Sequence, residues 1–234
     1  MSSNQPLVSI AIPCYEMGGN GVKYLNFSLS KILIQNYPNI EVIISDHSKD
    51  NKIKNYIKKW DQLLTIKYVK NTHKRGSSSS NLNIALKHCT GSLIKILFQD
   101  DYLLEPNSLS TQVNCFLEAD TQWLATACGH SNDHVNVTNP HLPRYNDLIA
   151  YGKNTISSPS VIMVKNQDLE LFDENLIWLM DCDYYKRMYN KFGLPAICNY
   201  ITVINYLHPD QVSNTLANDQ VRKDELEYVR KKHL

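Results

Sequence analysis

The chain has 234 residues, which suits one domain that can bury a sizeable core without disulfides or structural metals. Apolar residues make up 43% and charged residues 20%, which excludes a disordered or fibrous chain. With 24 basic and 23 acidic side chains the formal net charge is +1, so no global field attracts nucleic acid or a membrane surface. An anionic ligand must therefore be met by a local site.

The six cysteines form no Cys-x-x-Cys pair, and most lie inside apolar runs. We therefore predict free thiols in a reducing cytoplasm, with a disulfide framework or a zinc site as the alternative. The segment from Met1 to Pro6 is polar and lacks the apolar stretch of a signal peptide. No stretch approaches the ~18 apolar residues of a membrane span. We expect a cytoplasmic protein with no transmembrane segment and no nucleic-acid partner, and the oligomeric state stays open.

Short apolar runs and helical spacing alternate along the first half of the chain. Strands are predicted at 7–12, 41–45, 65–69 and 93–98. Between them apolar residues recur at three- and four-residue steps, which predicts helices over 24–33, 53–60 and 82–89, and Pro106 with Ser108 opens a further helix. This order predicts an α/β fold with a Rossmann-like, mostly parallel sheet flanked by helices. Ligands of such sheets bind at the carboxyl ends of the strands.

The second half is less regular. Residues 129–157 are polar and predict a long loop, followed by a strand at 160–164. A helix is predicted from Asp181, one or two strands between 196 and 206, and a charged helix from Asn218. We predict a single domain with a nucleotide-sugar-binding half at 1–101, a metal- and acceptor-binding catalytic half at 102–215, and a charged C-terminal helix at 216–234.

Asp100 and Asp101 end the fourth strand. Adjacent carboxylates disfavour joint ionisation unless a cation binds them. A hard divalent ion, Mg²⁺ or Mn²⁺, takes one or two carboxylates together with phosphate oxygens of a substrate. The alternative is a solvated turn in which an aspartate caps a helix. Other polar groups end the neighbouring strands, so we expect a shared metal and ligand site at this edge.

Six short motifs lie along the chain in a fixed order. They are the segment from Val8 to Glu16, Asp46 after the second strand, the segment from Arg75 to Gly91 with Asn83, Phe98 to Asp101, Met180 to Asp183, and His208 to Ser213. This order resembles that of the family 2 glycosyltransferases, which have the GT-A fold, and it covers roughly residues 7–214. Two departures stand out: Gln99 replaces the first acid of the metal-binding motif, and Met180 replaces the acid that usually precedes the aspartate of the fifth motif.

The resemblance implies a role for each matching residue. A nucleoside-diphosphate sugar, with UDP or dTDP favoured, would be held by Pro13, Tyr15, Glu16, Asp46, Arg75, Asn83 and Asp100. Asp46 would accept the imide N–H of uracil or thymine. Asp101 and His208 would bind the metal, Mn²⁺ or Mg²⁺, and Asp181 would be the general base. Ser158 and Trp178 would contact the acceptor, a glycan or another hydroxyl compound, and a single in-line displacement would invert the anomeric carbon.

Alternatives stay open at two points. Asp183 could be the base in place of Asp181, or both could only cap their helix. The domain could also be a nucleotidyltransferase, although the Gly-rich basic loop of that class is missing after the first strand. A third possibility is a non-catalytic domain that binds sugars or proteins. Hydrolysis of a sugar nucleotide separates the first function from the third.

Overall fold

The computed structural model describes residues 5–211 and 217–234. The start of the polar N-terminal segment, the last two residues of the predicted His208 to Ser213 motif and the predicted boundary at 215–216 lie outside the described residues. In the described chain no helix is both long and apolar enough to span a bilayer.

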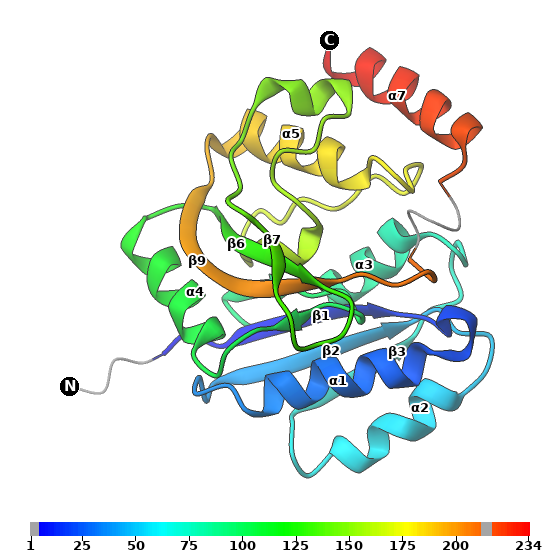
Figure 1. Ribbon diagram of the computed structural model, residues 1–234, viewed down its shortest axis with the longest axis vertical. Helices are drawn as coiled ribbons and strands as arrows, with labels where there is room; N and C mark the ends of the chain where they lie inside the picture. The colour runs from blue at the N-terminus through cyan, green and yellow to red at the C-terminus, as the bar shows by residue number, and fades with distance from the viewer. Residues whose placement is uncertain (1–4, 212–216) are drawn as a thin grey trace.

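The first half of the chain forms a parallel sheet with helices on both faces. Its strands lie in the order β3-β2-β1-β4, and the register pairs Cys14 with Asp46 at the ends of β1 and β2. Helices α1 and α2 lie on one face of these strands and α3 lies on the other (Figure 1). The elements are β1 (Val8–Cys14), α1 (Gly21–Leu33), β2 (Ile40–Asp46), α2 (Lys52–Ile57), β3 (Ile66–Lys70), α3 (Ser78–Lys87) and β4 (Leu93–Ile96), with short 3-10 turns at Met17–Gly19 and Lys58–Trp60.

The second half extends the same sheet, in the order β4-β8-β6-β9-β5, with β7 paired to β6. Strands β6 and β9 run in the direction of β1, whereas β5, β7 and β8 run against it. The predicted α/β fold with a mostly parallel sheet is therefore confirmed. The elements are β5 (Tyr102–Leu103), α4 (Ser108–Glu118), β6 (Trp123–Ser131), β7 (Thr138–His141), β8 (Ile162–Lys165), α5 (Met180–Phe192), β9 (Ala196–Tyr206) and α7 (Asp219–His233), with 3-10 turns at Asp147–Tyr151 and Pro159–Val161.

The long strand β9 curls as it crosses the molecule (Figure 1). Its register against β6 jumps between Cys198 and Ile201, so two residues of β9 bulge out of the ladder. A bulge of this kind bends its strand and increases the local twist. The bend brings the far end of β9, up to Tyr206, back towards the carboxyl ends of β1 and β4, where Tyr206 contacts Asp101.

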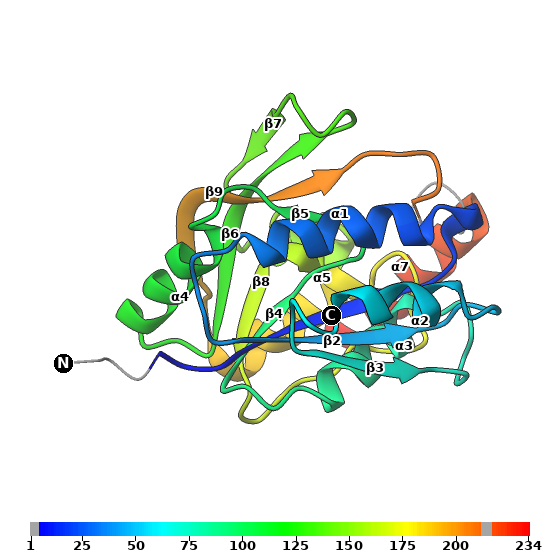
Figure 2. The same cartoon turned by 90° about the horizontal axis from the view of Figure 1, so that it is seen from below.

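The prediction of a loop over 129–157 is wrong in part. Strand β6 runs on to Ser131, and β7 follows as its antiparallel partner, so the two form a hairpin that projects from the sheet (Figure 2). Strand β7 pairs with β6 alone and carries the sequence Thr-Asn-Pro-His, which is mostly exposed. An edge strand of this kind needs no apolar face and tolerates proline, so its sequence reads as a loop.

The charged C-terminal helix α7 packs beside α5 (Figure 1). Val229 is fully buried in the main hydrophobic core, and Glu225 is only 6% exposed. Lys232 reaches two carboxylates, Asp173 at 2.6 Å and Asp183 at 2.8 Å. The helix is therefore held by Val229, by Leu226, which also packs against the core, and by several buried or half-buried charged contacts.

Candidate active site

A cavity of about 700 Å³ opens at the carboxyl ends of β1 and β4. Its walls come from these strand ends, the segment that leads into α3, the residues before β8 and the strip that leads into α5. Nine of the site residues predicted from the sequence line it: Pro13, Tyr15, Glu16, Arg75, Asp100, Asp101, Ser158, Trp178 and Asp181. The sheet edge thus brings together residues that lie far apart in the sequence, as expected for an open α/β sheet.

The hydrogen bonds of Gln99 account for an amide at a position where the acidic motif usually has a carboxylate. The Oε1 of Gln99 accepts the backbone N–H of Tyr15 at 2.6 Å, and its Nε2 donates to the carbonyls of Tyr15 at 3.1 Å and Gly21 at 3.0 Å. A carboxylate has no hydrogen to donate to those two carbonyls. A side chain on Gly21 is excluded as well, because a Cβ there would lie 2.2 Å from the Tyr15 oxygen. The amide therefore fixes the turn that presents Tyr15 to the cavity.

Asp100 and Asp101 occupy different environments, although they are adjacent. The Nε2 of His208 lies 2.8 Å from the Oδ2 of Asp100. Asp101 is only 3% exposed, and its carboxylate accepts the backbone N–H of Tyr206 at 3.0 Å and the hydroxyl of Ser158 at 3.4 Å. Burial, and then the charge of Asp100, raise the pKa of Asp101 to about 8. The pair therefore presents more negative charge than its surroundings stabilise.

This carboxylate pair fits a hard divalent cation that is shared with a substrate. Mg²⁺ and Mn²⁺ prefer oxygen ligands and use few protein carboxylates when phosphates complete the shell. Within residues 5–211 and 217–234, no group of three His, Cys, Asp or Glu side chains is placed to hold a metal on its own. The residues present therefore fit a cation whose coordination a bound diphosphate completes.

Asp181 lies in the first turn of α5 and lines the cavity. Its Oδ2 accepts the side-chain amide of Asn154 at 2.6 Å, and its Oδ1 accepts the backbone N–H of Cys182 at 2.7 Å. Burial raises the pKa of Asp181 to about 6, and the hydrogen bonds from Cys182 and Asn154 limit the rise. The start of a helix favours an ionised acid, but here burial outweighs that effect. The carboxyl titrates close to neutral pH, which suits a general base.

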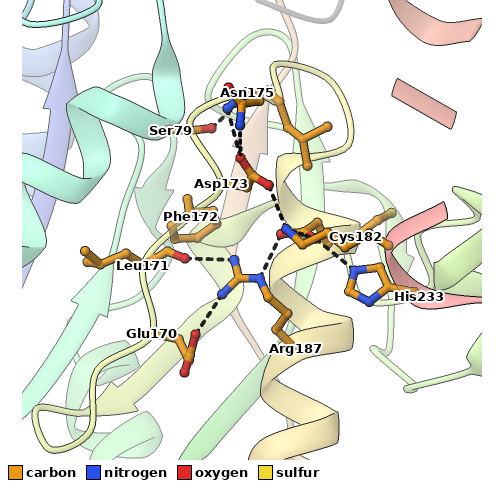
Figure 3. Close-up of polar contacts among 12 residues, drawn as sticks. Ser79, Glu170, Leu171, Phe172, Asp173, Asn175, Cys182, Arg187 and His233 are labelled. Atoms are coloured by element: carbon orange, nitrogen blue, oxygen red, sulfur yellow. Dashed lines mark hydrogen bonds and ion pairs between the residues drawn. The ribbon is translucent and has the colours of Figure 1, made fainter. Parts of the chain in front are cut away.

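Asp183 does not line the cavity. It is fully buried and contacts Arg187 at 2.9 Å, Lys232 at 2.8 Å and His233 at 2.8 Å. Burial raises its pKa, but His233, Arg187 and Lys232 more than reverse this and hold the pKa at about 2. Figure 3 shows Arg187 extending to Glu170 while His233 approaches from α7. Asp183 therefore joins α5 to α7, and Asp181 is the carboxylate that faces the cavity.

Three predicted site residues lie outside the cavity lining. His208 is linked to the cavity through Asp100, whose Oδ2 lies 2.8 Å from its Nε2. Asp46 is fully buried, and it accepts hydrogen bonds from the Ser48 N–H at 2.8 Å, the Tyr68 hydroxyl at 2.7 Å and Lys70 at 3.3 Å. These contacts tie the ends of β2 and β3 together. The predicted contact of Asp46 with a pyrimidine ring therefore does not fit this geometry.

Asn83 is the third residue outside the cavity. Its amide exchanges two hydrogen bonds with the backbone of Phe172, one at 2.9 Å to the carbonyl and one at 2.8 Å from the N–H. It is 2% exposed. This double contact fastens α3 to the segment between β8 and α5. Both polar ends of the side chain are already bonded, so we propose that Asn83 has a structural role, and its predicted role in nucleotide binding remains to be tested.

The sequence reasoning missed several groups on the acceptor side, which come from the segment predicted to be a loop. Ser157 lines the cavity with φ at 109°, a conformation that costs a non-glycine residue about 1–3 kcal/mol. Its carbonyl accepts the Tyr185 hydroxyl at 2.9 Å and the Asn154 amide at 3.0 Å, and its hydroxyl accepts the Asn205 amide at 2.9 Å. These contacts stabilise the strained turn. No spacing in the sequence signals them.

The parallel sheet, the acidic pair at its carboxyl edge and a separate aspartate on the same cavity define a GT-A-type glycosyltransferase. The model of the family described as Glycosyl transferase family 2 matches residues 9–178. The chain belongs to glycosyl transferase family 2.

Curated relatives carry the same assignment. A glycosyltransferase of Rickettsia prowazekii is 26% identical over 94% of this chain and 70% of its own length. A glycosyltransferase of Haemophilus influenzae is 33% identical over 49% of this chain and 44% of its own length.

Solved structures share the fold. The TarS 1-349 chain of S. aureus, solved with UDP-GlcNAc, superposes with a TM-score of 0.76 at 18% identity, over 97% of this chain and 66% of that chain. The mannosyltransferase PcManGT of Pyrobaculum calidifontis, solved with GDP-Man and Mn²⁺, gives a TM-score of 0.60 at 18% identity, over 99% of this chain and 62% of that protein.

The structural role of Asn83 is testable. Asn83→Ala leaves the N–H and carbonyl of Phe172 without their partner, so we expect the free energy of unfolding to fall by about 1–3 kcal/mol. Urea denaturation followed by circular dichroism measures this. Asn55 is exposed on α2, and Asn55→Ala is the matched control, expected within about 0.5 kcal/mol of wild type. Nucleotide affinity should be unchanged in both, and a selective loss of affinity in Asn83→Ala would restore Asn83 to the donor site.

Proposed function

We propose that this chain transfers a sugar from a nucleoside-diphosphate donor to a hydroxyl acceptor, with a divalent metal and with inversion at the anomeric carbon. The observation that carries this proposal is that the Asp100–Asp101 pair and Asp181 line one cavity at the carboxyl edge of the sheet. The Asp100–Asp101 pair suits a divalent metal that binds the diphosphate, and Asp181 suits the proton of the acceptor hydroxyl. A nucleotide-binding domain without catalysis has no use for the second carboxylate.

The donor lies along β1 and β4 in this proposal. Tyr15 offers an aromatic face, and Arg75, which also lines the cavity, offers a cation for the phosphates. The best-matching fold reported above, TarS, was solved with UDP-GlcNAc, and this likeness supports a uridine nucleotide. UDP or dTDP sugars remain our proposal. Selection of the base rests on cavity residues rather than on Asp46, which is buried and bonded.

Asp101 would hold the metal, and Asp100, oriented by His208, would contact the metal's shell or the ribose of the donor. When bound, Mg²⁺ or Mn²⁺ neutralises the charge that develops on the departing diphosphate. The complex of PcManGT with GDP-Man and Mn²⁺ supports this arrangement. The hydrogen bonds from Tyr206 and Ser158 keep the Asp101 carboxylate in one orientation.

In this proposal the acceptor binds near Ser158 and Trp178, which both line the cavity. Asp181 would remove the proton of the attacking hydroxyl, because its carboxylate faces the cavity and its pKa of about 6 leaves it mostly ionised at neutral pH. Asn154 fixes one carboxylate oxygen at 2.6 Å. The attack displaces the diphosphate in a single step, so the configuration at the anomeric carbon inverts and no covalent intermediate with the protein forms.

Replacement of the proposed base tests this function most simply. Asp181→Asn removes the proton acceptor and keeps the shape, so we expect turnover of a sugar nucleotide to fall by about 10²–10⁴-fold. Affinity for UDP with Mn²⁺, measured by calorimetry, should stay near wild type because the carboxylate of Asp181 is bonded to Asn154 and Cys182 and is not part of the Asp100–Asp101 pair. The comparison variant Asp183→Asn should lower the melting temperature and keep most of the turnover. Full activity in Asp181→Asn would show that another group takes the proton.

The pKa of Asp181 sets a pH dependence. Only the ionised carboxylate accepts a proton, and burial has raised its pKa to about 6. The rate should therefore be constant above about pH 7 and fall about tenfold per pH unit below the pKa. Initial rates between pH 5 and pH 8 measure this limb, and Asp181→Asn should lack it. A wild-type profile that is flat down to about pH 5, or the same limb in Asp181→Asn, would contradict the assignment.

A further inference from the structure

A carboxylate from α7 caps the start of α5. Glu225 accepts three backbone N–H groups, from Ile177 at 2.7 Å, Trp178 at 2.9 Å and Leu179 at 2.7 Å. Leu179 is the N-cap residue of α5, and no side-chain hydrogen bond caps the helix from that position. These three N–H groups precede Met180, the first residue of α5, so Glu225 binds the strip that leads into the helix, next to the partial positive charge of the helix N-terminus. Glu225 supplies both hydrogen-bond acceptors and a negative charge from a distant part of the sequence.

The capped strip is also a wall of the cavity. Ile177, Trp178, Met180 and Asp181 line the cavity, whereas Glu225 does not. Glu225 is 6% exposed and lies behind the strip. A change at Glu225 therefore reaches the cavity through the backbone of residues 177–179. This differs from the Asp183 cluster, which joins the same two helices further along α5.

We propose that Glu225 is a positioning residue for the acceptor side: its carboxylate holds residues 177–179 so that Trp178 and Asp181 keep their places in the cavity. The catalytic part of this inference rests on the proposed function, whereas the structural part does not. A displacement of about 1 Å of a catalytic group can cost about 10²-fold in rate. A helix that served stability alone would need no buried carboxylate aimed at this strip.

Two variants separate positioning from simple stability. Glu225→Gln keeps the size of the side chain but replaces one acceptor oxygen with an amino group that faces backbone donors. Val229→Ala weakens the apolar seat of the same helix and leaves the three hydrogen bonds in place. Glu225→Asp keeps the charge on a shorter side chain, and it serves if Glu225→Gln does not fold.

Four measurements on the full chain separate effects on the strip from effects on the donor side. Hydrogen exchange by mass spectrometry follows the amides of a peptide over 176–181. Acrylamide quenching follows Trp178, with Trp178→Phe used to subtract Trp60 and Trp123, which are both buried. Hydrolysis of UDP-GlcNAc in the presence of Mn²⁺ follows catalysis with water as the acceptor. Calorimetry with UDP and Mn²⁺ follows the donor side.

In Glu225→Gln we expect at least about tenfold faster exchange at 177–179, stronger quenching of Trp178 and about 10–100-fold slower hydrolysis, with UDP affinity within twofold of wild type. In Val229→Ala we expect a lower melting temperature with wild-type behaviour in the other measurements. Equal loosening in both variants, or none in Glu225→Gln, would overturn the proposal. A loosened strip with unchanged hydrolysis would also overturn it. If wild type hydrolyses no UDP-GlcNAc, that is a result against the proposed function, and the exchange and quenching data still decide whether Glu225 holds the strip.

Discussion

Two adjacent carboxylates, Asp100 and Asp101, follow the buried strand β4, and Asp101 is almost fully enclosed. Two neighbouring carboxyl groups in a buried place cannot both ionise at low cost. Burial, and then the charge of Asp100, therefore raise the pKa of Asp101 to about 8. The hydrogen bonds to Asp101 from Tyr206 and Ser158 come from neutral groups, so they do not compensate the negative charge of the pair. In the proposed function a bound divalent cation would supply the missing positive charge, and the diphosphate oxygens of the donor would complete its coordination.

The acceptor side depends on charges that are satisfied within the chain. Asp183 and Glu225 both lie between α5 and α7. The partners of Asp183 are three basic side chains, and those of Glu225 are three backbone N–H groups. Asp181 lies on the same first turn, but only neutral hydrogen bonds hold it, so its pKa is near 6 instead of near 2. Two aspartates separated by one residue thus acquire different chemistry because one points into the cavity and the other into the helix pair.

The sequence indicated the fold well where periodicity and burial agree. Four short apolar runs separated by helical spacing predict parallel strands, and the polar residues that end β1 and β4 do meet at one cavity. Side-chain partners from distant segments could not be predicted. Nothing near Asp46 indicates that Tyr68 and Lys70 occupy its carboxylate, and nothing near Asn83 indicates Phe172. The β6–β7 hairpin escaped notice because an exposed edge strand needs no apolar pattern, and Glu225 is one acid among many on a charged helix.

We propose that Asp101 and a divalent ion together bind the donor diphosphate. Calorimetric titration measures the UDP affinity with Mn²⁺ present and with a chelator present. The account predicts strong binding with Mn²⁺, a large loss of affinity when the metal is removed, and a similar loss in Asp101→Ala with Mn²⁺ present. Asp61 is exposed and directly follows the 3-10 turn Lys58–Trp60, so Asp61→Ala is the control and should bind UDP as wild type does. Equal UDP affinity with and without metal, or full Mn²⁺-dependent binding in Asp101→Ala, would contradict the account.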